Sequence, residues 1–149
     1  MAHNTLGIEI SDMRKRLRAA IDKSRKAADA RRIEVDQASA AYEEFLVRLA
    51  EPLVHMLANA LRAEGFAFTV FTPKRGLRLS SSRSAEDFIE FALDTAVPHP
   101  TVLLRVNRGR GRRVVQHERP IRGEERIDQL TEEDVLNALM EEIGPFVER

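Results

Sequence analysis

The fold is decided by residues Ile8–Leu49, which read IEISDMRKRLRAAIDKSRKAADARRIEVDQASAAYEEFLVRL. This stretch contains neither Pro nor Gly, and its apolar residues recur about every 3.5 residues. The pattern predicts one long helix of roughly 60 Å, at about 1.5 Å per residue. A chain of 149 residues does not need so long a helix for one compact domain, so we expect part of it to pack on another helix.

Two heptad positions of this helix carry apolar side chains in its outer parts, as in the seam of a coiled coil. The predicted oligomer interface consists of Leu17, Ile21, Ala28, Val35, Ala38, Tyr42, Phe45 and Leu49. The middle of the seam is small or polar, at Ser24, Ala28 and Arg31. An αα-hairpin, broken within Lys26–Arg32 and folded on itself, is therefore a second interpretation.

The net charge is zero, but the charges are segregated along the chain. Residues 10–32 carry nine basic and three acidic side chains, whereas residues 33–65 carry two basic and six acidic ones. Antiparallel packing of two copies would bring opposite charges together, and so would a hairpin folded on itself. The pattern therefore predicts either a homodimer or a self-folded arm. The basic patch Arg14–Arg18 is alternatively a candidate contact for anionic lipid or nucleic acid, although the helix there is not apolar enough for stable membrane insertion.

The remainder of the chain has an α+β pattern. Glu51-Pro52 predicts a helix boundary, because Pro is favoured in the first turn of a helix, and Gly65 ends the helix that follows. From Phe66 onward the apolar period changes to two, which is typical of strands. Predicted strands cover residues 66–71, 77–80, 101–106 and 114–119, and Thr131 caps a final helix that stops at Gly144-Pro145.

Residues 86–94 admit two interpretations. Ser84-Ala85-Glu86-Asp87 resembles a helix capping box, yet Ile89, Phe91 and Leu93 alternate with their neighbours as in a strand. The neighbouring segments favour the strand. The predicted architecture is an N-terminal helical arm over residues 1–50, or an αα-hairpin, followed by a two-layer α+β domain over residues 51–149. In that domain an antiparallel meander of four to five strands is covered on one face by two helices.

Composition limits the available chemistry. The chain has no Cys, and its four His residues match no metal-ligand spacing. No Gly-rich loop follows a strand and opens a helix, and no nucleophile motif is present. We therefore expect no cofactor, no metal and no enzymatic activity. The N-terminal residues lack a signal-peptide pattern and no apolar run reaches about 20 residues, so we expect a cytoplasmic protein without membrane contact.

A basic hairpin is the second prominent feature. Its arginines, the candidate phosphate-binding residues, are Arg105, Arg108, Arg110, Arg112 and Arg113. The planar guanidinium suits phosphate, but no aromatic residue is interleaved to stack bases. The alternative is a solvated hairpin, or one neutralised by the acidic C-terminal helix.

These observations predict a non-enzymatic interaction or assembly protein that forms a homodimer, or docks a protein partner, through its helical arm. A nucleic-acid-associated protein using the basic hairpin is the second hypothesis. A regulator that senses a small ligand in a cleft under the helices is the third.

Overall fold

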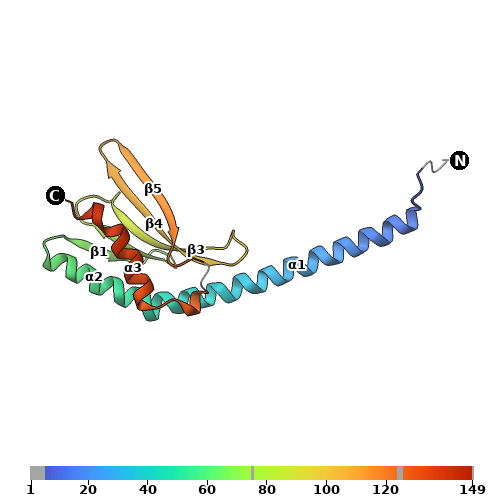
Figure 1. Cartoon of the computed structure of the whole chain (residues 1–149), viewed down its shortest axis with the longest axis horizontal. Helices are drawn as coiled ribbons and strands as arrows, with labels where there is room; N and C mark the ends of the chain where they lie inside the picture. Colours follow the sequence, from blue (N-terminus) through green and yellow to red (C-terminus); the bar gives the residue numbers. More distant parts are fainter. Residues whose placement is uncertain (1–5, 75, 124–125, 149) are drawn as a thin grey trace. The chain divides into compact units, whose positions relative to one another are not determined.

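The computed structural model describes residues 6–74, 76–123 and 126–148. The chain has an α+β fold in which a long N-terminal helix precedes a five-stranded antiparallel meander and a C-terminal helix (Figure 1). The helical elements are α1 (Ile10–Phe45), a π-helical turn (Leu46–Ala50), α2 (Glu51–Ala63) and α3 (Glu132–Ile143). The strands are β1 (Phe68–Phe71), β2 (Leu77–Ser81), β3 (Phe88–Asp94), β4 (Thr101–Arg110) and β5 (Arg113–Pro120).

The α1 helix runs without a break through Lys26–Arg32, so the single-helix prediction is confirmed and the αα-hairpin is wrong. No Pro or Gly interrupts it, and ion pairs one turn apart support its exposed surface. Arg16 lies 3.2 Å from Asp12, and Arg32 lies 2.6 Å from Asp29.

Helix α2 begins at Glu51, at the predicted boundary, but the chain does not leave the helix before it, because a π-helical turn over Leu46–Ala50 joins α1 to α2. Pro52 lacks an N–H, and its ring would clash with the carbonyl four residues earlier in a regular α-helix. The wider π turn over Leu46–Ala50 relieves this clash, with the Glu51 N–H donating to the carbonyl of Leu46. The backbone therefore stays helical from α1 into α2.

The chain consists of two compact units, and the boundary between them lies between Asp36 and Gln37. Residues 37–50, which the sequence pattern assigned to the arm, belong to the same compact unit as the sheet. The reason lies in the apolar side chains of this segment. Tyr42, Phe45 and Leu46 are buried in the core of that unit.

The sheet has the order β1-β2-β3-β4-β5, and every neighbouring pair is antiparallel. Residues 88–94 form a strand, which confirms that interpretation over the helix. The capping-box-like segment before it is a turn, in which the Glu86 N–H donates to the Ser84 hydroxyl at 3.2 Å.

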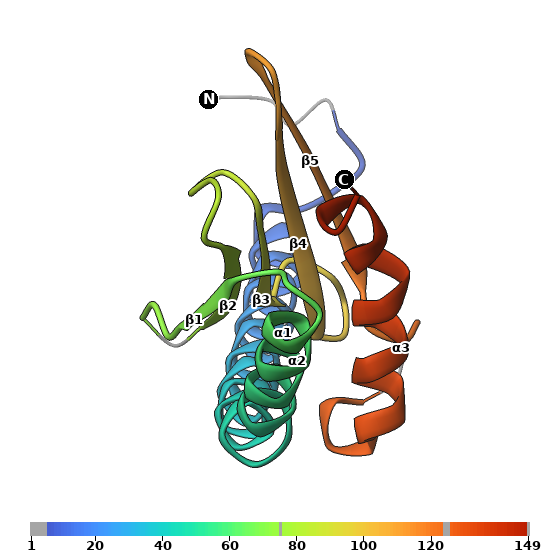
Figure 2. The ribbon, with the colours of Figure 1, turned by 90° about the vertical axis from the view of Figure 1, so that its left-hand side faces the viewer.

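One apolar core lies between the sheet and the helices (Figures 1 and 2). Alternate strand residues, including Leu79, Ile89 and Leu104, point into it and pack with Val54 of α2 and Leu139 of α3. The opposite face of the sheet carries paired charges. Arg78 lies 3.3 Å from Glu90, and Arg105 lies 3.3 Å from Glu118 on the neighbouring strand.

The α3 helix begins with the predicted cap. The Thr131 hydroxyl accepts the N–H of Asp134, and the Asp134 carboxylate accepts the N–H of Thr131 in return. Acidic side chains of α3 then bind the last strand. Arg119 pairs with Glu141 and Glu142, and His117 lies 2.7 Å from Glu142.

Candidate interaction surfaces

The first part of α1 exposes a stripe of large apolar side chains. Ile10, Met13, Leu17 and Ile21 are 69%, 53%, 58% and 41% exposed. At 3.6 residues per turn these four side chains fall within about 80° of the helix circumference. Ser24 and Ala28 continue the same face with small side chains. We call the set Ile10, Met13, Leu17 and Ile21 the arm stripe.

The predicted interface residues divide into two groups. Leu17, Ile21 and Ala28 are exposed on α1, as an interface in the free chain requires. Val35, Ala38 and Leu49 are half-buried, and the last two pack against the core. Tyr42 and Phe45 are buried in that core, where their rings stack with centroids 6.4 Å apart. The surface available for association is therefore the N-terminal part of the predicted seam.

Ile10 and Met13 belong to the arm stripe but were not among the predicted interface residues. Arg14 occupies the same heptad position as Ile21 and Ala28, so the predicted seam has no apolar side chain there. Ile10, Met13, Leu17 and Ile21 are spaced three or four residues apart, and this spacing in the sequence could have predicted that they share one helix face.

The basic hairpin forms, but with longer strands than expected. Most of the segment between the predicted strands 101–106 and 114–119 is strand, because β4 continues to Arg110 and β5 begins at Arg113. A tight turn at Gly111-Arg112 joins them. Gly111 has a φ of 62°, a conformation that glycine adopts without strain. Residues 108–110 pair only with β5, so this end of the hairpin extends past β3 (Figure 2).

The five candidate phosphate-binding arginines differ in their partners. Arg105 is paired with Glu118. Arg108, Arg110, Arg112 and Arg113 form no ion pair with the residues that the structure describes, and Arg110 lies directly across from Arg113. The acidic α3 helix pairs instead with His117, Arg119 and Arg122. Within the described residues, the end of the hairpin is thus a cluster of four unpaired positive charges.

The described residues contain no group of three or more His, Asp or Glu side chains that is arranged to hold a metal ion. Of the histidines, His117 pairs with Glu142, and His55 is an exposed residue 3.9 Å from Glu51. Among residues 6–74, 76–123 and 126–148, no helix has both the length and the apolar content that are needed to cross a membrane.

Comparison of the chain with protein-family models, with curated proteins and with solved structures finds no match. The arm stripe and the basic hairpin are the features of the chain that bear on its function.

Proposed function

We propose that this chain is an assembly protein that forms a homodimer through its N-terminal arm. The observation that carries the proposal is the exposure of all four large side chains of the arm stripe. Covering solvent-exposed apolar side chains that are contiguous on one helix face with a second helix removes apolar surface from water, which lowers the free energy. Ser24 and Ala28, next on the same face, would let the two helices approach closely.

The segregation of charge along the helix favours a second copy of this chain, in an antiparallel orientation, as the partner of the arm. Residues 10–32 are strongly basic, and the exposed side chains of the following helical residues include Glu43 and Glu44. Antiparallel arms would set the basic segment of one copy along these carboxylates of the other. Parallel arms in register would place nine basic side chains against nine, which opposes association.

The proposal is tested with two variants that make the same chemical change on different helix faces. Leu17→Glu places a charge in the arm stripe. Ile33→Glu places the same charge on a side chain that is equally exposed, at 58%, but lies about 160° around the helix. Light scattering coupled to size-exclusion chromatography should show a dimer for the wild type and Ile33→Glu, and a monomer for Leu17→Glu. If the two variants have the same mass as the wild type, the arm stripe is not the interface.

A second candidate function, the binding of nucleic-acid phosphates, is favoured by one specific observation. Arg110 and Arg113 face each other across the hairpin, although like charges directly opposite one another destabilise a sheet. A polyanion would remove this repulsion and would match the four arginines at the hairpin end.

This second function predicts binding that weakens steeply with salt. Replacing Arg108, Arg110, Arg112 and Arg113 by Ala should reduce the slope of log K against log salt by about 3 to 4, at close to 0.9 per phosphate contact on duplex DNA. Arg126→Ala, which removes an exposed arginine that pairs with Asp128, is the control and should leave the slope unchanged. Absent binding, or binding insensitive to salt, would exclude this function.

A further inference from the structure

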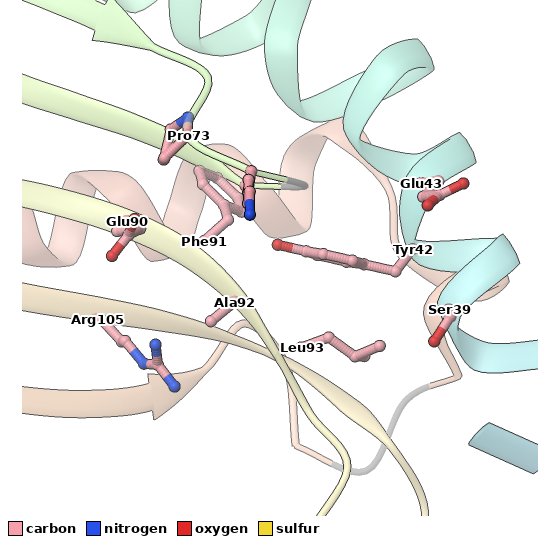
Figure 3. A pocket seen from close by; sticks show the side chains of 11 residues that line it. Ser39, Tyr42, Glu43, Pro73, Glu90, Phe91, Ala92, Leu93 and Arg105 are labelled. Atoms are coloured by element: carbon pink, nitrogen blue, oxygen red, sulfur yellow. The ribbon is translucent and has the colours of Figure 1, made fainter. Parts of the chain in front are cut away.

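A pocket of about 290 Å³ lies where Tyr42 of α1 meets the sheet. It opens beside β3, beyond the point where β2 begins, because Leu77 pairs with Phe91 and the following β3 residues Ala92, Leu93 and Asp94 pair only with β4. The pocket is lined on the sheet side by Pro73, Glu90, Leu93 and Arg105, and on the helix side by Ser39 and Tyr42 (Figure 3). All of these residues belong to the unit that begins at Gln37.

The Tyr42 side chain extends from the helix into this pocket, with its hydroxyl at the end farthest from the helix (Figure 3). Tyr42 is only 4% exposed, and its hydroxyl has no hydrogen-bond partner among the residues that the structure describes. A buried hydroxyl without a partner is uncommon and costs free energy, so a partner from outside the chain would satisfy it. Burial, with a contribution from Glu90, raises the pKa of this hydroxyl, so it keeps its proton and can donate it.

The charges around the hydroxyl define what that partner would be. Glu90 is already paired with Arg78, and Arg105 is already paired with Glu118. Lys74 also lines the pocket and forms no ion pair with the described residues. Glu43 lines the pocket as well and has an interaction partner of its own. Among the described lining residues, the Tyr42 hydroxyl is therefore a neutral donor without a partner, and the Lys74 ammonium is a cation without an ion pair. Both would bind a carboxylate oxygen.

Apart from Ser39 and Glu43, the rest of the described lining is mainly apolar. Pro73, Phe91, Ala92 and Leu93 offer hydrocarbon surface next to the two donors. At about 290 Å³ the pocket lies at the lower end of the size range of small-molecule sites, which is about 300–1,000 Å³, so its ligand is small. We propose that this pocket binds a small monocarboxylate, with its carboxylate on Tyr42 and Lys74 and its short hydrocarbon part on Pro73 and Leu93.

The chain contains its own reporter for this site. Tyr42 is its only Tyr, and Trp is absent, so the intrinsic fluorescence of the protein comes from the residue in the pocket. Titration of the full chain with 3-methylbutanoate should change this fluorescence in a saturable way. The uncharged isostere 3-methylbutanamide should bind at least tenfold more weakly, because it removes the charge that Lys74 recognises.

Two variants complete the experiment. Lys74→Met, which keeps the length of the side chain and removes its charge, should weaken 3-methylbutanoate at least fivefold, whereas Lys26→Met on exposed α1 should not change the affinity. Tyr42→Phe, followed by calorimetry because it removes the fluorophore, should weaken binding at least tenfold.

Several results would overturn the proposal. Equal binding of the amide and the carboxylate would show that charge is not recognised. Tighter binding of leucine would assign the pocket to a zwitterion. If the fluorescence does not change in a saturable way with 3-methylbutanoate, 3-methylbutanamide or leucine, the pocket does not bind these ligands and the Tyr42 hydroxyl is satisfied by water.

Discussion

The Tyr42 hydroxyl is buried without a hydrogen-bond partner among the described residues, and the Tyr42 ring stacks with Phe45. Removing a buried donor that has no partner removes its desolvation penalty, and the ring that remains still fills the same space. The free energy of unfolding of Tyr42→Phe without ligand should therefore exceed that of the wild type by about 1 kcal/mol. Chemical denaturation followed by circular dichroism measures this difference.

The Thr131 hydroxyl is the matched control for this prediction, because it caps α3 and does have a partner. Thr131→Ala should lower the free energy of unfolding by about 1 kcal/mol. A loss of stability in Tyr42→Phe as well would mean that the Tyr42 hydroxyl is satisfied within the chain.

Asp134 gives the fold a dependence on acid pH. Its hydrogen bonds with Thr131 and, to a smaller extent, its proximity to Arg122 lower the pKa of its carboxyl below the ordinary value of 3.8. The folded state therefore binds this proton less readily than the unfolded state, and the ionised carboxylate stabilises the fold at neutral pH. This contribution is present above pH 3.8 and is lost as the pH falls through the lowered value of the folded state.

Asp134→Asn should accordingly be less stable than the wild type at pH 7, and the difference should shrink as the pH is lowered below 3.8. Thermal unfolding of both proteins at several pH values between 7 and 2.5 would show this convergence. Glu133→Gln, in the same helical turn, should show less of it. A difference that stays constant with pH would exclude a role for the ionised form of Asp134.

The hairpin formed by β4 and β5 carries a like-charge pair at its end. Arg113→Glu would place an acidic side chain opposite Arg110, and cross-strand opposite charges contribute roughly 0.2–1 kcal/mol to a sheet. The variant should therefore be more stable than the wild type by a few tenths of a kcal/mol. Arg112→Glu, in the turn and without a residue opposite, is the control and should leave the free energy of unfolding nearly unchanged. A destabilised Arg113→Glu would contradict this account of the hairpin.

The helices, strands and turns differ in how well their sequences predicted them. Period-two alternation at Ile89, Phe91 and Leu93 predicted β3 although a capping-box pattern preceded it, because burial of one face outweighs a local cap signal. Pro52 correctly predicted the start of α2, but it did not predict that the helix continues through the boundary, where a π-helical turn accommodates the proline. The hairpin loop was predicted too long because Gly109 lies within a strand, next to Glu86 and Asp87.

The candidate sites were harder to predict, because a heptad pattern does not say which partner covers it. Tyr42 and Phe45 continue the apolar spacing of the arm, yet they pack on their own sheet. The pocket at Tyr42 joins Ser39, Lys74 and Glu90 from three separate segments, so no local motif in the sequence announces it.

At the scale of the whole molecule, the orientation of the dimer can be tested through its carboxylates. Glu43→Gln with Glu44→Gln removes two exposed negative charges that antiparallel arms place near the basic segment of the other copy. The double variant should dimerise more weakly than the wild type if the arms are antiparallel, and more strongly if they are parallel in register. Glu132→Gln with Glu133→Gln, on α3, should leave the dissociation constant unchanged, and analytical ultracentrifugation measures all three proteins.

The account depends most directly on the mass of the wild-type particle. Sedimentation equilibrium of the full chain over a range of concentrations should give twice the chain mass of 16.9 kDa, with dissociation only on dilution. A mass of 16.9 kDa at every concentration would show that the exposed stripe from Ile10 to Ile21 does not bind a second copy, and would contradict the account.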